Sequence, residues 1–250
     1  MDKPAMLLRV IACDVLTREV CWCAARTPHT LDISFTAKGE HNAPTKLRAL
    51  LQEQIDGAAQ NASPYDAVLL AYGLCGNAAV GLTARDCPLV IPRAHDCTTL
   101  FLGSKEAFRA HFGANPSQAW TSVGYAERGD AILSDGDARS FSETGLSFAQ
   151  IVEQYGEENA RYLVAALSAG HDSPEIPFLD VPETHIPAIV ARIREHIAAR
   201  GKTMRPLPGN IALIENLLFG DWPEDQFLVV PPGARIEGVY DHNQVLKATS

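Results

Sequence analysis

Cysteine and histidine side chains mark the ends of three predicted strands, and their chemistry suits a metal ion. Cys13 ends the apolar run AMLLRVIAC, Cys75 ends YDAVLLAYGLC, and His95 and Cys97 follow CPLVIPRA. Zinc in proteins takes thiolate and imidazole ligands, with four in structural sites and three plus water in catalytic sites. Mixed sulfur and nitrogen ligands favour zinc over iron or copper. The sequence therefore predicts a zinc site formed by Cys13, Cys75, His95 and Cys97.

The spacing of these residues permits a shared site but does not require one. His95 and Cys97 are two residues apart, so in an extended segment their side chains project to the same side. Cys75 precedes a stretch predicted to form a short helix, whose positive end favours a thiolate. The alternative is that each cysteine only packs at a strand end, because free cysteine is among the most buried residue types.

Two further residues, His41 and Glu19, are candidates for proton transfer beside such a site. His41 lies between a predicted strand and an amphipathic helix, where a histidine can be a ligand, an acid–base group or a helix cap. Glu19 lies in the helix predicted to follow Cys13 and to be capped by Asp14, so it is an acid–base candidate or an ordinary solvated glutamate. We expect a catalytic role for both.

The remaining cysteines and histidines are interpreted as structural. Cys21 and Cys23 lie two apart in a predicted helix, where their side chains diverge by about 200°. Cys87 precedes a proline at the amino end of its strand, on the edge opposite the proposed site. The other histidines have no comparable neighbours in the sequence: His29, His111, His171, His185, His196 and His242.

Alternating strands and helices must position the candidate residues. Strand-like runs occur at residues 5–13, 30–37, 65–75 and 87–97, and a helical pattern follows each of them. Such alternation predicts an α/β fold with a mostly parallel sheet flanked by helices, in a Rossmann-like three-layer arrangement. Ligands of open parallel sheets bind beyond the carboxyl ends of the strands, so the site is expected at that edge.

The rest of the chain is expected to extend this α/β domain. We predict a single domain over residues 1–250, with an irregular loop or lid at about 113–145, where glycine, serine, aspartate and aromatic residues occur without periodicity. Further helices are predicted at 147–170, 183–201 and 209–220, and further strands at 175–181 and 226–236.

Composition narrows the class of protein. A chain of 250 residues with 46% apolar residues can bury a sizeable core. A net charge of -9 argues against binding to nucleic acid or to an anionic membrane. No signal peptide and no run of 18 apolar residues is found, and six cysteines are too sparse for a disulfide scaffold. We expect a cytoplasmic protein that acts on a small molecule or a protein partner.

Common nucleotide and hydrolase motifs are missing from the sequence. The stretch Gly103-Ser104-Lys105 lacks the rest of a P-loop, and no G-x-G-x-x-G follows the first strand. A G-x-S-x-G nucleophile elbow is missing too. The metal site is therefore the main chemical hypothesis that the residues support.

Several segments resemble one family. The stretches YGLCGNAAVGL, PLVIPRAHDCTTLFLGSKEAF, YGEENARYL and FLVVPPG are similar to the uncharacterised family catalogued as domain of unknown function 1638. Membership implies an α/β protein often encoded near corrinoid proteins and methyltransferases of the trimethylamine and glycine-betaine type. It thus implies a role in one-carbon metabolism, with a corrinoid or methylcorrinoid protein as partner.

The zinc site and the resemblance together suggest a zinc-dependent methyltransferase. Zinc bound by cysteine and histidine can hold a thiol substrate as a thiolate, which is a nucleophile toward a methyl group. Two alternatives stay open: an accessory protein that binds metal or corrinoid without catalysis, and a metal-dependent hydrolase that uses a zinc-bound water.

Overall fold

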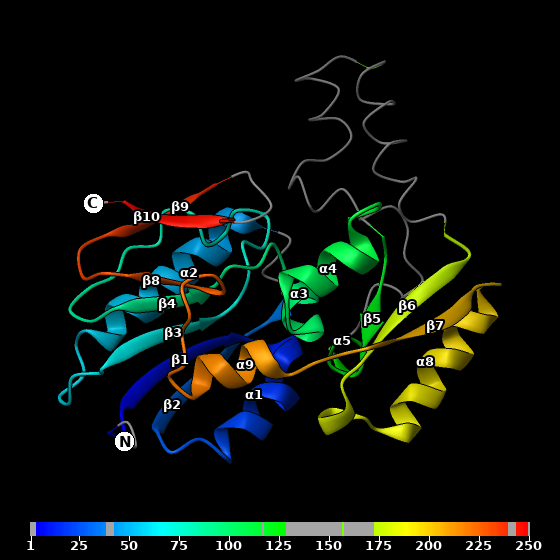
Figure 1. Ribbon diagram of the computed structural model, residues 1–250, viewed down its shortest axis with the longest axis horizontal. Helices are drawn as coiled ribbons and strands as arrows, with labels where there is room; N and C mark the ends of the chain where they lie inside the picture. Colours follow the sequence, from blue (N-terminus) through cyan, green and yellow to red (C-terminus); the bar gives the residue numbers. More distant parts are fainter. Residues whose placement is uncertain are drawn as a thin grey trace. The chain divides into compact units, whose positions relative to one another are not determined.

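The computed structural model describes residues 4–38, 43–116, 118–128, 157, 173–239 and 244–249. The chain separates into two compact units, one made of residues 1–107 and 210–250 and the other of residues 108–209. Each unit has its own sheet (Figure 1). The expectation of a single domain over residues 1–250 stays a prediction.

The sheet of the first unit has five strands and is mostly parallel. In the order β2-β1-β3-β4-β8, its strands are Thr30–Thr36, Leu7–Cys13, Ala67–Ala71, Leu89–Pro92 and Phe227–Val230. The first four run parallel, and β8 is antiparallel to β4. This confirms the predicted α/β class with a mostly parallel sheet.

Helices cover this sheet because its central strands are too apolar to face water. Every residue of β3 and β4 is buried, as expected for parallel strands covered on both faces. The helices of the unit are α1 Thr17–Ala24, α2 Pro44–Ala58, α3 Cys97–Leu102, α4 Lys105–Phe112, which continues into the second unit, and α9 Ala212–Leu218. Figure 1 shows α1 and α9 side by side. In α2, Leu47, Leu51 and Ile55 form the buried stripe.

Two predicted helix features of this unit are wrong. The stretch after Cys75 forms turns instead of a helix, because Cys75, Gly76 and Asn77 all have positive φ, at 47°, 63° and 68°. A right-handed helix cannot begin with three left-handed residues. Asp14 does not cap α1, since a 3-10 turn at Asp14–Leu16 comes first and the Asp14 carboxylate accepts a hydrogen bond from the Lys38 backbone N–H at 2.9 Å.

The second unit has a smaller parallel sheet. Its order is β5-β6-β7, with Thr121–Ser122, Glu175–Asp180 and Thr203–Pro208. Its described part includes the helices α5 Val123–Glu127 and α8 Pro187–Ala199, with a 3-10 turn at Pro182–Thr184. The sequence pattern did not indicate β7, because proline is atypical of strands, but its two prolines are tolerated in an edge strand.

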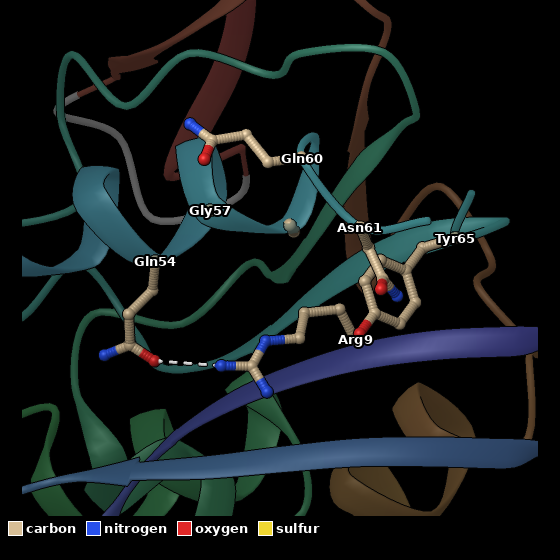
Figure 2. Close-up of a pocket in the computed structure, with 7 residues that line it drawn as sticks. Arg9, Gln54, Gly57, Gln60, Asn61 and Tyr65 are labelled. Carbon is tan, nitrogen blue, oxygen red and sulfur yellow. Dashed lines mark hydrogen bonds between the residues drawn. The ribbon is translucent and has the colours of Figure 1, made fainter. Parts of the chain in front are cut away.

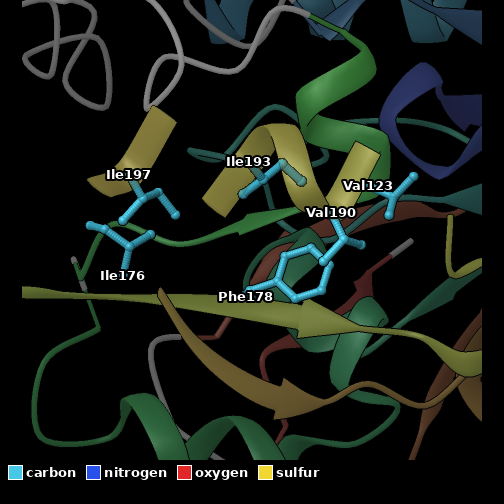
Figure 3. Packing of buried hydrophobic residues seen from close by; sticks show 6 residues of the cluster. All are labelled: Val123, Ile176, Phe178, Val190, Ile193 and Ile197. Atoms are coloured by element: carbon cyan, nitrogen blue, oxygen red, sulfur yellow. The ribbon is translucent and has the colours of Figure 1, made fainter. Parts of the chain in front are cut away.

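One apolar cluster holds α8 against this sheet. Ile176 and Phe178 of β6 lie under Val190, Ile193 and Ile197 of α8, with Val123 of α5 beside them (Figure 3). The α8 residues recur at helical spacing and so lie on one face of the helix. The pattern that predicted a helix at 183–201 and a strand at 175–181 thus reflects this packing.

The remaining expectations concern the middle and the end of the chain. Residues 121–127 of the expected loop form β5 and α5, whereas residues 129–145 lie outside the described part, as does nearly all of 147–170. A two-stranded antiparallel sheet, β9 Arg235–Gly238 with β10 Leu246–Thr249, completes the first unit. Among the helices of the described ranges, none is long and apolar enough to cross a membrane.

Candidate functional site

Parallel pairing brings the ends of β1, β3 and β4 to one edge of the first sheet. Cys13, the last residue of β1, pairs in register with Thr36, and the residue before it pairs with Ala71, the last residue of β3. Strand β4 pairs with the other side of β3. The segments that carry Cys75 and Cys97 therefore leave the sheet at the same edge as Cys13.

The two loops that follow β3 and β4 are in near contact through their backbones. The Leu74 N–H donates to the Ala94 carbonyl at 2.8 Å, and the Cys75 N–H donates to the His95 carbonyl at 3.0 Å. Gly73 lies so close that an added Cβ would be 2.7 Å from the Asp96 nitrogen. Only glycine fits there, and it allows the loops to approach.

Cys75 has an unusual backbone conformation for a cysteine. Its φ of 47° lies in the left-handed region, which costs a non-glycine residue free energy and is found preferentially at functional sites. Arg48 of α2 donates a hydrogen bond to the Asn77 carbonyl at 2.7 Å, which helps to fix the turn. A left-handed turn therefore sets the backbone conformation of Cys75, in place of the helix start that the sequence predicted.

Burial keeps the thiols of Cys13 and Cys75 protonated. It raises the pKa of Cys13 from 9.0 to about 12, and the neighbouring Asp14 carboxylate also raises it, while the Val15 backbone N–H and Lys38 lower it. Burial also raises the pKa of Cys75, and so does the nearby Cys13 thiol. The two sulfur atoms are therefore within electrostatic reach of each other.

Tyr72 lies near these thiols and was missed in the sequence. It is 1% exposed, and its hydroxyl shares a hydrogen bond with Thr36 Oγ1. Burial raises the pKa of Tyr72, and Cys13, Cys75 and Cys97 add to the effect. We define the thiol cluster as Cys13, Cys75 and Cys97, with Tyr72 among them.

Asp96 organises the segment that carries His95 and Cys97. Its backbone is extended, and its carboxylate accepts hydrogen bonds from the N–H groups of Thr98 at 3.0 Å and Thr99 at 3.4 Å. Burial raises the pKa of Asp96. Asp96 is thus the N-cap of α3, and Cys97 is the first residue of that helix.

Glu19, His41 and Lys38 differ in how the structure places them. Glu19 is 1% exposed in α1, so it is not an ordinary solvated glutamate. His41 lies outside the described residues. Lys38, which the sequence analysis overlooked, follows β2 closely and lowers the pKa of Cys13, so its ammonium lies near that thiol. Its position just after a strand was the available signal.

The structure contains side chains of the kinds that bind zinc, but in the described ranges they are not arranged around a common point. In the ranges that the structure describes, no three His, Cys, Asp or Glu side chains are arranged to hold a metal ion. The cysteine sulfurs nevertheless belong to the class of donor that zinc prefers. The thiol cluster fits a metal by its donor types, and its side chains would have to turn to bind one.

A polar surface pocket lies elsewhere on the first unit. It encloses about 400 Å³ and is lined by Arg9, Gln54, Gly57, Ala58, Gln60, Asn61 and Tyr65. Figure 2 shows Arg9 reaching Gln54, to which its guanidinium donates a hydrogen bond at 3.4 Å. Arg9 also donates to Ser34 Oγ at 2.9 Å. The pocket contains none of the predicted site residues.

Two of the histidines interpreted as structural have hydrogen-bond partners that the sequence did not reveal. His185 Nδ1 lies 2.6 Å from Asp180 Oδ1, across the turn that follows β6. His29 Nδ1 accepts from the Met6 N–H at 3.2 Å, and its Nε2 bonds the Phe219 carbonyl at 3.1 Å. Together these bonds define a neutral His29 with the proton on Nε2.

The cysteines interpreted as structural lie apart from the cluster. Cys21 is exposed and Cys23 is buried, as expected for residues on diverging sides of α1. Cys87 is partly buried just before β4.

The molecule is thus an α/β protein with a mostly parallel sheet and buried thiols at one sheet edge. Residues 35–218 match the family model described as "Protein of unknown function (DUF1638)", and the chain belongs to that family. The matched residues include Tyr72, Cys75, His95 and Cys97 and leave out Cys13. Searches of curated proteins and of solved structures give no match.

The raised thiol pKa values predict a loss of stability in alkali. Cys13 keeps its proton up to about pH 12 in the folded chain but loses it near 9.0 in the unfolded chain. Its stabilising effect is therefore complete below pH 9 and falls above it, by about 1.4 kcal/mol per pH unit. Denaturant unfolding at pH 8 to 11 should show a shallower alkaline decline for metal-free Cys13→Ala than for the parent. An equal decline of stability with pH in the two proteins would contradict the raised pKa of Cys13.

Proposed function

We propose that the protein binds zinc through Cys13, Cys75, His95 and Cys97, beyond the carboxyl ends of β1, β3 and β4 in a Rossmann-like first unit. One observation carries the proposal: three buried cysteines leave adjacent parallel strands at the same edge. Ligands of open parallel sheets bind at this edge. The loops after β3 and β4 are joined by backbone hydrogen bonds, which supports a shared site for Cys75 and His95.

The charge of the cluster supports a cation as the occupant. Burial disfavours a thiolate at Cys13 and Cys75, so these two thiols are neutral in the absence of a metal. A divalent cation reverses this preference because it pairs with the thiolate charge, and binding then releases protons. The affinity for zinc should therefore rise with pH.

The proposal requires the ligand side chains to turn toward a common ion. The backbones of Cys13, Cys75 and Cys97 are fixed by a strand end, a bonded turn and a helix start. A cysteine side chain changes its direction by rotation about a single dihedral angle between staggered wells. We propose that zinc turns the cysteine sulfurs by such rotations while the sheet keeps its pairing.

We further propose that the zinc site serves methyl transfer linked to a corrinoid protein. Zinc bound there would supply the Lewis acidity that converts a thiol substrate to a nucleophilic thiolate. Glu19, buried in α1, and His41 are the proposed acid–base groups. Lys38 lies near Cys13 and adds positive charge that favours an anionic substrate sulfur. The resemblance in sequence supports this role.

Metal content tests the proposal directly. Full-length protein purified without chelators and without a histidine tag should contain about one zinc ion per chain. Cys97→Ser and Cys75→Ser should contain little, because each loses a ligand. Cys21→Ser, which changes an exposed cysteine of α1, is the matched control and should keep its zinc. A parent protein that takes up no zinc under reducing conditions would refute the site.

An activity assay separates the enzyme from an accessory protein. The zinc-loaded protein should transfer the methyl group of methylcobalamin to a simple thiol, with the methyl–cobalt bond broken and a methyl–sulfur bond formed. The metal-free protein should be inactive. Zinc binding without transfer, together with stoichiometric binding of a corrinoid protein, would favour the accessory role instead.

A further inference from the structure

Tyr72 reaches across the strand that carries Cys13. It follows β3 directly, whereas its hydrogen-bond partner Thr36 ends β2, and β1 lies between these two strands. Thr36 is also the registered partner of Cys13. The phenol side chain therefore spans the end of β1, and its hydroxyl arrives beside Cys13.

The donors of the two hydroxyl groups can be counted. Tyr72 and Thr36 have one O–H each, and the bond between them uses one of these donors. When Thr36 is the donor in the shared bond, the second donor of the pair is the Tyr72 O–H, which lies at the end of β1 where Cys13 is registered with Thr36.

We propose that the Tyr72 hydroxyl donates a hydrogen bond to the Cys13 sulfur in the metal-bound state, while Thr36 orients that hydroxyl. The inference rests on the proposed zinc site. Tyr72 is then a positioning residue that stabilises one metal-bound thiolate and makes it less basic, as partners of metal ligands generally do. Cys75 and Cys97 keep more of their basicity and nucleophilic character.

A purely structural role gives different results. If the hydroxyl pair only joins β2 to β3, its removal would lower the stability of the metal-free protein. It would not change the electronic properties of a bound metal. The two roles are therefore separated by a spectroscopic measurement on the metal-bound protein.

The experiment compares full-length parent, Tyr72→Phe, Thr36→Val and Thr36→Ser loaded with zinc or cobalt(II). Tyr72→Phe should weaken zinc binding by about 10-fold to 100-fold in a chelator competition. It should also shift the sulfur-to-cobalt charge-transfer band. Thr36→Val should cause a smaller change, and Thr36→Ser, which keeps the hydroxyl, should restore the behaviour of the parent.

The possible results distinguish the inference from the proposed function. If the parent binds neither zinc nor cobalt(II), the zinc site itself fails. If the parent binds metal and Tyr72→Phe has the same affinity and the same charge-transfer band, the zinc site stands and the hydrogen bond to Cys13 is overturned. A weaker affinity and a shifted band in Tyr72→Phe, together with parent-like behaviour of Thr36→Ser, support the inference.

Discussion

Gly73→Ala is expected to lower the free energy of unfolding by about 3 kcal/mol, as overpacking against fixed atoms does. The added Cβ would lie 2.7 Å from the Asp96 nitrogen, 2.8 Å from its Cα and 2.9 Å from the Ala94 carbonyl oxygen. These are backbone atoms, so no side-chain rotation relieves the clash. The loops after β3 and β4 must separate, which breaks the bond from the Cys75 N–H to the His95 carbonyl.

The effect should extend from stability to the proposed zinc site. Gly73→Ala should lose most of its zinc at concentrations that saturate the parent, because Cys75 moves away from His95 and Cys97. Denaturant unfolding and metal analysis of the same samples measure both quantities.

Gly57→Ala is the matched control for this substitution. Gly57 lies in α2, and an added Cβ there would meet no atom within 4 Å. Alanine favours a helix more than glycine by about 0.5–1 kcal/mol, so this variant should be slightly more stable and keep its zinc. If Gly73→Ala were as stable as Gly57→Ala, the close approach of the two loops would be refuted.

Arg93→Ala should lower the free energy of unfolding by about 4 kcal/mol, because it removes a buried cation and the donor for several backbone carbonyls. Arg93 follows β4 and is 7% exposed. Its Nε donates to the carbonyl of Glu224 at 2.8 Å and of Phe227 at 3.2 Å, and its Nη1 donates to the carbonyl of Gln244 at 2.8 Å and to that of Leu246. Thermal and denaturant unfolding should both show the loss.

Two comparisons make the Arg93 prediction specific. Arg93→Lys keeps the charge but lacks the planar fork of donors, so its loss should be intermediate. Arg85→Ala removes an exposed arginine whose Nε lies 2.7 Å from Asp56, and it should cost less than about 1 kcal/mol. Equal costs for Arg93→Ala and Arg85→Ala would show that the buried bonds to the carbonyls contribute little.

The sequence predicted the parallel part of the first sheet well, because continuous apolar runs are typical of strands buried on both faces. The direction of each strand relative to its neighbours was harder to predict. Strand β8 resembles the parallel strands in composition, and only its pairing with β4 makes it antiparallel. Strand β7 was missed because its prolines, acceptable at an edge, argue against a strand when the edge is unknown.

The candidate site was predictable at the level of strand ends and not at the level of side chains. Cys13, Cys75 and Cys97 stood out because cysteine is rare and each lies at a junction. Tyr72 did not, since an aromatic residue in an apolar run looks like core until its hydroxyl partner is known. The left-handed backbone of Cys75 had no sequence signal, because it is imposed by the surrounding bonds.

The carbonyls that accept hydrogen bonds from Arg93 are synthesised more than 100 residues after Arg93 itself. The first unit consists of residues 1–107 and 210–250, so the whole second unit is synthesised before β8 emerges from the ribosome. Until then β4 is an open side of the sheet, and the carbonyls of Gln244 and Leu246 are synthesised after β8. The β4 side of the first sheet is therefore completed only after the whole second unit has been synthesised, and until then its backbone hydrogen-bonding groups are exposed to other strands.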